Sequence, residues 1–125
     1  MAAQQYINFN PGTGPYTYAS GVSYVAAGQI VVGPAVLYNF SGFSSLASLQ
    51  WILFFDVSAV GNIGSAGPTI VVQVGGAAAA GNIPWNDLGA KGQVFNNGIY
   101  WTNSTTAPSV TIGATNCFLR ASYNI

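Results

Sequence analysis

Turn-forming residues divide this chain into short segments, and their spacing is the feature that most constrains the fold. Glycine, proline, asparagine, serine and threonine recur about every eight to twelve residues, between short runs rich in valine, isoleucine and aromatic residues. No segment holds a 3.6-residue apolar period beyond two turns, whereas this spacing is the one expected of a β-sandwich or barrel. The pattern therefore predicts a single all-β domain.

Eight segments have the composition of β-strands. They span residues 22–26, 29–32, 35–41, 49–57, 69–74, 98–103, 109–112 and 117–123. Eight strands are what a jelly roll needs, so we expect a single-domain antiparallel β-sandwich, jelly-roll-like, over residues 21–125. The last segment alternates, which predicts that Leu119 faces the core while Arg120 faces solvent or a neighbour.

The segment 49–57 does not alternate, because every residue from Trp51 to Phe55 is apolar. A strand that is apolar on both faces must be covered on both faces. We therefore expect a central strand whose outer side meets another subunit, with Trp51 as a candidate interface residue. A short buried helix is the alternative, since periodicity does not separate the two.

Residues 1–20 are either an extended N-terminal arm or the first strand of the domain. This uncharged stretch contains four aromatic residues, Tyr6, Phe9, Tyr16 and Tyr18. On an arm they would dock into a neighbouring subunit, because aromatic rings supply a large contact area at low rotamer cost. All four are candidate residues of a subunit interface.

Charge is almost absent from this chain, which holds two acidic and two basic residues and has a net charge of zero. A soluble domain is typically about one quarter charged, so we expect much of this surface to be covered by other subunits of an ordered assembly. Two cations are too few for a nucleic-acid site, and no apolar run reaches the roughly 20 residues of a membrane helix. Neither nucleic acid nor a membrane is therefore an expected partner.

Catalytic and metal-binding residues are scarce. Histidine and glutamate are absent and Cys117 is the one cysteine, so we expect no catalytic residues, no metal, no cofactor and no enzymatic activity. Asp56 is expected to end or cap its strand. Asp87 is expected to pair with Lys91 across the turn at Gly89.

A weaker signal for ligand binding comes from Trp85, which follows Pro84 in a loop-like setting. Exposed aromatic rings stack on sugar rings, so Trp85 is the candidate ligand contact. The simpler interpretation is that Trp85 is a core or interface anchor, as tryptophans often are.

From residue 37 onward the order of motifs resembles that of small structural proteins of tailed bacteriophages. The motifs are LYNFSG at 37–42, WILFFD at 51–56, a connection ending in Pro68, GIY at 98–100, NSTT at 103–106 and a closing strand to Tyr123. The resemblance implies a virion component with a compact β fold. It also implies a homo-oligomer, often a trimer, that bridges subunits of the major capsid protein.

The expected function is therefore that of a capsid decoration or cement protein, made in the bacterial host cytoplasm and located on the capsid surface of the virion. One alternative is a tail or fibre component that binds a glycan or receptor. Another is a self-polymerising β protein, because uncharged strands lack the lysines and prolines that protect sheet edges.

Overall fold

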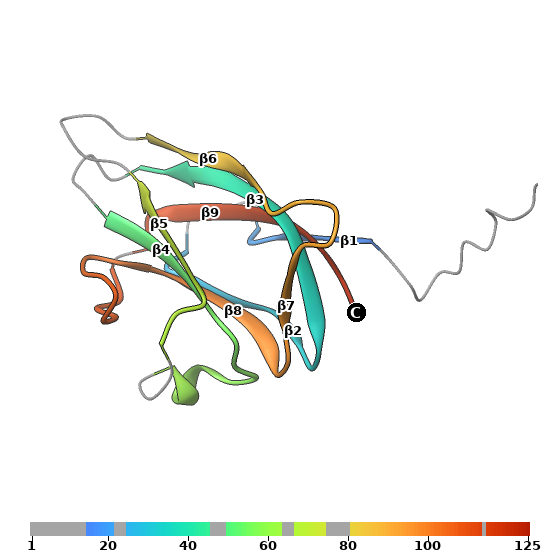
Figure 1. Cartoon of the computed structure of the whole chain (residues 1–125). Coiled ribbons are helices and arrows are strands. Elements are labelled where there is room, and N and C mark those ends of the chain that lie inside the picture. The colour runs from blue at the N-terminus through green and yellow to red at the C-terminus, as the bar shows by residue number, and fades with distance from the viewer. Residues whose placement is uncertain (1–14, 22–24, 46–49, 64–66, 75–80, 114) are drawn as a thin grey trace, which may run out of the picture.

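The computed structural model describes residues 15–21, 25–45, 50–63, 67–74, 81–113 and 115–125, and in these ranges the chain is all-β (Figure 1). The strands are β1 (Tyr16–Ala19), β2 (Ala27–Val32), β3 (Ala35–Ser44), β4 (Gln50–Phe55), β5 (Ile70–Val74), β6 (Gly81–Asp87), β7 (Gln93–Phe95), β8 (Gly98–Ser104) and β9 (Cys117–Asn124). A short 3-10 turn, η2, spans Val60–Asn62. None of the described residues belongs to a helix that is long and apolar enough to cross a membrane.

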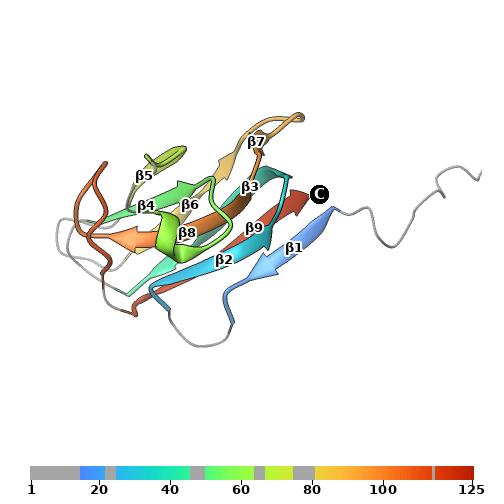
Figure 2. The ribbon, with the colours of Figure 1, turned by 90° about the horizontal axis from the view of Figure 1, so that it is seen from below.

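Two antiparallel sheets pack face to face (Figure 2). Sheet A has the order β1-β9-β3-β6, with β7 also paired to β3, and sheet B has the order β2-β8-β4-β5. Apart from β7, the strands pair as in a long hairpin that has been rolled up: β1 with β9, β2 with β8, β3 with β6 and β4 with β5. This nesting is the topology of a jelly roll, so the predicted fold class is confirmed.

Six of the predicted strands are present, as β2, β3, β4, β5, β8 and β9. The strands predicted at 22–26 and 109–112 are wrong for the residues that the structure describes. Val25 forms only an isolated bridge to Cys117, and Ile112 forms only an isolated bridge to Ser104. Strands β6 and β7 were not predicted. Strand β6 contains Pro84, which a central strand would not accept. Proline is tolerated here because β6 is an edge strand, and the β3–β6 register shifts nearby, between Phe40 and Gly42.

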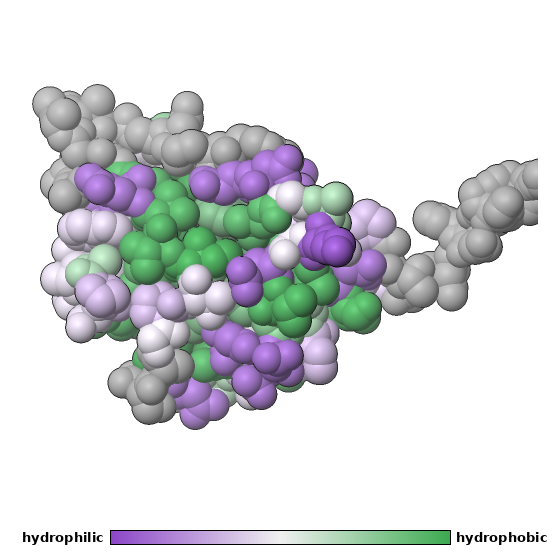
Figure 3. All heavy atoms as spheres, in the orientation of Figure 1, coloured by the Kyte–Doolittle hydropathy of each residue, from purple (hydrophilic) through white to green (hydrophobic). Residues whose placement is uncertain are grey.

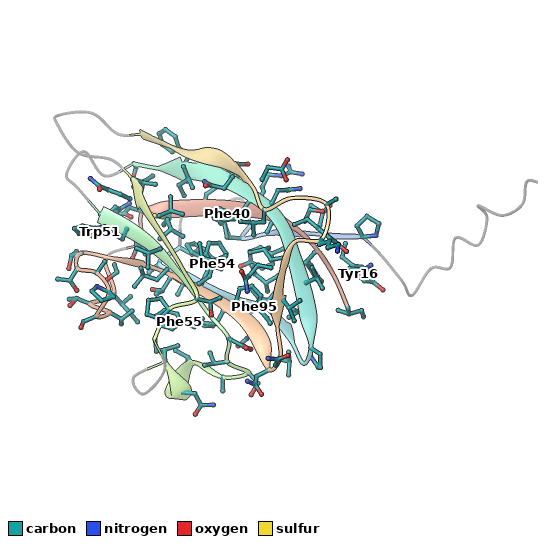
Figure 4. The ribbon with its side chains drawn as sticks, in the orientation of Figure 1. Tyr16, Phe40, Trp51, Phe54, Phe55 and Phe95 are labelled. Atoms are coloured by element: carbon teal, nitrogen blue, oxygen red, sulfur yellow. The ribbon has the colours of Figure 1, made fainter. Side chains whose placement is uncertain are left out.

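The main core lies between the sheets and is built from alternate residues of the strands. Its largest fully buried side chains include Trp101 and three phenylalanines, Phe40, Phe54 and Phe95, which Figure 4 labels. The rings of Phe40 and Phe54 lie with centroids 4.5 Å apart and join sheet A to sheet B. The alternation predicted for β9 is confirmed, because Leu119 is fully buried in this core while Arg120 is exposed.

A second apolar cluster covers the other face of β4. Leu53 and Phe55 point away from the main core and pack with Val57, Ile63 and Tyr100. The prediction that β4 is a central strand covered on both faces is confirmed. The prediction that another subunit covers Leu53 and Phe55 is wrong, because the chain's own segments after β4 and within β8 bury them.

Candidate functional site

Cys117 lies in a buried polar cluster at one end of the sandwich. Its sulfur is 3.4 Å from the side-chain nitrogens of both Gln50 and Asn103, and it donates to Asn116 Oδ1 at 3.3 Å. Asn103 also donates to Asn116 Oδ1, at 2.8 Å. Because Cys117 is fully buried and only neutral side chains contact its sulfur, the cluster ties β4, β8 and β9 together and presents no nucleophile.

Asp56 lies directly after the last residue of β4, so the expectation that it ends its strand is confirmed. It caps a different segment, the turn between β7 and β8. Its carboxylate accepts hydrogen bonds from the backbone N–H of Asn96 at 2.9 Å and of Asn97 at 2.6 Å. Burial by itself would raise the pKa of Asp56, but the bonds from the backbone of Asn96, Asn97 and Gly98 outweigh it and hold the pKa below its ordinary value. This charge therefore stabilises the β7–β8 turn.

The candidate interface residues are not brought together in the described structure. Tyr6 and Phe9 lie outside the described residues. Tyr16 and Tyr18 lie on β1, which pairs with β9, so the first-strand alternative holds for Tyr16–Ala19. The ring of Tyr16 stacks on Tyr123 of the same chain, with centroids 5.4 Å apart.

Tyr18 is used inside its own domain. Its hydroxyl accepts a hydrogen bond of 3.2 Å from the indole N–H of Trp101, which is fully buried. The sequence did not reveal this pair, because the two residues lie far apart along the chain.

The two tryptophans singled out in the sequence lie on different sheets. Trp51 begins the apolar run of β4 and packs, partly buried, against the second cluster. Trp85 lies on β6 rather than in the expected loop, and the structure describes only its backbone.

The outer face of sheet A carries a polar row that the sequence did not predict. The strand register places one polar residue from each of four strands side by side: Thr17 of β1, Ser122 of β9, Asn39 of β3 and Asp87 of β6. Next along the sheet, Ser41 pairs with Arg120. The row extends about 14 Å across the sheet, since neighbouring strands lie about 4.8 Å apart.

Two adjoining hollows follow this row, and we call them together the sheet A groove. The larger measures about 530 Å³ and is lined by Pro15, Tyr38, Asn39, Asp87, Gly89, Ala90, Ser122 and Asn124. The smaller measures about 140 Å³ and is lined by Thr17, Asn39, Ser41, Arg120, Ala121 and Ser122. Asn39 and Ser122 belong to both, so the two hollows form one open groove.

Most polar side chains of the sheet A groove have unused hydrogen-bonding capacity. Among the described residues, the side chains of Asn39, Ser122 and Arg120 have no hydrogen-bond partner. Asp87 accepts one bond of 3.0 Å, from the N–H of Gly89, instead of the expected pair with Lys91. The groove therefore offers donors and acceptors to a ligand from outside the domain.

A resident metal ion has no ligand set in the described ranges, where no three histidine, cysteine, aspartate or glutamate side chains gather. The unused donors and acceptors of the sheet A groove can bind a polar ligand. No protein-family model, curated protein or solved structure that was compared with the chain matches it.

Proposed function

We propose that this chain is a non-enzymatic structural protein of a bacteriophage virion, and specifically a decoration protein that bridges capsid subunits on the particle surface. Three features support the proposal: a jelly-roll sandwich, a sequence with four charged residues in 125, and the resemblance of its motifs to phage structural proteins. The function requires a stable β domain with large surfaces that pack against other chains.

The observation that carries the proposal is the uncharged edge of sheet B, where the exposed side chains of β5 (Ile70–Val74) are Val71 and Gln73. Strand β5 is an edge strand, and Val71 on its outward side is 45% exposed. Figure 3 shows apolar residues gathered on this side of the molecule. Because Ile70–Val74 holds no lysine or proline, its unpaired backbone groups are open to pairing with another chain, which proteins that live as monomers avoid.

Further apolar contact area lies on two other segments. Val32 on β2 and Val60 on η2 are 67% and 51% exposed. The turn after β2 and the 3-10 turn both lie toward the lower end of the view in Figure 1. Such side chains favour association through apolar burial rather than through ion pairs.

The mechanism would be mass action. A protein that binds the assembled lattice and not its free subunits stabilises that lattice by the free energy of binding. Contacts that span two capsid subunits would then oppose their separation by heat or internal pressure.

The copy number of the chain in purified virions tests the proposal. We expect quantitative mass spectrometry to give a number close to that of the major capsid protein, and particles stripped of the chain to open at a lower temperature. A handful of copies would indicate a tail component. Complete absence from virions would overturn the proposal.

A further inference from the structure

We propose that the sheet A groove is a carbohydrate-binding site whose ligand is a neutral oligosaccharide. This inference goes beyond the structural role and does not depend on it, because it is based on one outer face of one sheet.

Hydrogen-bonding chemistry is the first reason. Neighbouring hydroxyls of a sugar each need a donor or an acceptor, and the amide of Asn39 offers both in the middle of the row. On one side lies Ser122, whose hydroxyl also donates and accepts, and on the other lies Asp87, one of whose oxygens has no partner among the described residues. These three side chains can therefore hydrogen-bond to neighbouring hydroxyls of one ligand.

Rigidity is the second reason. The row lies on four hydrogen-bonded strands of one sheet rather than on loops, so its spacing is set before any ligand arrives. Its length of about 14 Å, at about 4.8 Å per strand, suits an oligosaccharide better than a single sugar ring.

Aromatic rings at both ends of the same face are the third reason. Tyr38 lines the larger hollow and is half-buried. Beyond Ser41, Phe43 pairs with Phe118 across β3 and β9, and both are half-buried. Rings that are partly exposed in this way can pack against the apolar faces of sugar rings.

Charge separates this ligand from the alternatives. Asp87 and Arg120 both line the groove, and Lys91 adjoins the lining residue Ala90, so three of the four charged residues of the chain lie at or beside this face. Because both signs are present, the groove does not select a strongly anionic ligand such as a phosphate. The charged side chains of Asp87 and Arg120 in the groove disfavour a protein partner, because charges are depleted at the centre of protein interfaces.

The test is an NMR titration of the full chain with neutral oligosaccharides, namely the pentamers of α-1,4-glucose, β-1,4-glucose, mannose and N-acetylglucosamine. We expect at least one to produce saturable shifts in the backbone amides of residues 38–41 and 120–124. For an oligosaccharide that binds, Asn39→Ala should raise the dissociation constant about tenfold or more, which corresponds to about 1.4 kcal/mol of binding free energy. The side chain of Asn39 has no hydrogen-bond partner among the described residues, so this variant should have the same melting temperature as the natural chain.

The matched control is Asn96→Ala, which makes the same change at an exposed residue of the β7–β8 turn and should bind as the natural chain does. The proposal is overturned if none of the four sugars binds saturably, or if Asn39→Ala binds with full affinity. Virion copy number separates the two proposals: if sugar binding fails while the copy number stays high, only the carbohydrate site is overturned. If the natural chain binds none of the sugars and the Asn39→Ala variant is missing from virions, the groove is a protein interface instead.

Discussion

At the scale of single residues, individual polar side chains hold backbone or aromatic groups in place. Asp56 binds two backbone N–H groups of the β7–β8 turn, and Tyr18 satisfies the buried indole of Trp101. Such residues contribute more to stability than surface charges usually do, because their loss leaves donors unpaired.

We expect Asp56→Ala to lower the free energy of unfolding by about 1–2 kcal/mol at pH 7, measured by urea denaturation. Because the folded state holds the pKa of Asp56 below its ordinary value of 3.8, the unfolded state takes up the proton first as the pH falls. The difference between Asp56→Ala and the natural chain should therefore begin to shrink below about pH 4 and be lost as the pH falls through the lower pKa of the folded state. A difference that does not change between pH 7 and pH 3 would contradict this assignment.

Tyr18→Phe should lower the free energy of unfolding by about 1–3 kcal/mol, because the buried indole N–H of Trp101 loses its hydrogen-bond acceptor. Tyr38→Phe is the matched control, since the Tyr38 hydroxyl has no partner among the described residues and its loss should be nearly neutral. Thermal denaturation of the two variants checks the prediction. Equal melting temperatures would show that the Tyr18–Trp101 bond does not contribute to stability.

At the scale of elements, close packing of strands sets strict limits on side-chain size. A Cβ atom at Gly42 of β3 would overlap the carbonyl oxygen of Phe118 on β9, next to the register shift between β3 and β6. A Cβ atom at Gly28 of β2 would overlap the hydroxyl of Tyr18. These glycines are needed because other strands approach them closely.

Gly42→Ala should therefore destabilise the domain by more than about 2 kcal/mol, since backbone atoms of β3 or β9 must shift. Gly61→Ala serves as the control, because a Cβ there meets nothing within 4 Å. Denaturation midpoints should differ clearly between the two. A Gly42→Ala protein as stable as Gly61→Ala would refute the close approach of β9.

The exposed edge of β5 leads to a prediction about association. Val71→Lys should weaken self-association, because a charge on an edge strand blocks pairing with another chain. Sedimentation velocity measures the change, and Ser109→Lys adds the same charge at an exposed residue outside the strands. If both variants associate as the natural chain does, β5 does not mediate the contact.

At the scale of the whole molecule, the low charge determines how copies of the chain meet. With a net charge of zero there is no long-range repulsion to oppose association. The exposed apolar side chains supply the driving force, and ion pairs contribute little.

We expect the isolated chain to form a closed oligomer at micromolar concentration, with a mass that stays the same as sodium chloride is raised. Salt screens charges but leaves apolar contacts in place. Light scattering at several salt concentrations checks this expectation. A soluble monomer at all concentrations would contradict it, and a mass that grows without limit would favour a fibre-forming protein.

The sequence alone determined the fold class and most of the strands. Turn residues and the two-residue alternation are local properties, so β2, β3, β4, β5, β8 and β9 were found, and β9 was oriented correctly with Leu119 inside and Arg120 outside. The number of strands also pointed to a jelly roll. The local signal was insufficient at β6, where Pro84 argues against a strand.

Only the tertiary structure decided what covers β4 and where the sheet A groove lies. A strand that is apolar on both faces must be buried on both faces. The sequence does not show whether other segments of the same chain or another subunit bury the second face. Thr17, Asn39, Asp87 and Ser122 lie on four segments distant along the chain, and the strand register makes them neighbours. Register depends on contacts between segments, so no local pattern in the sequence determines it.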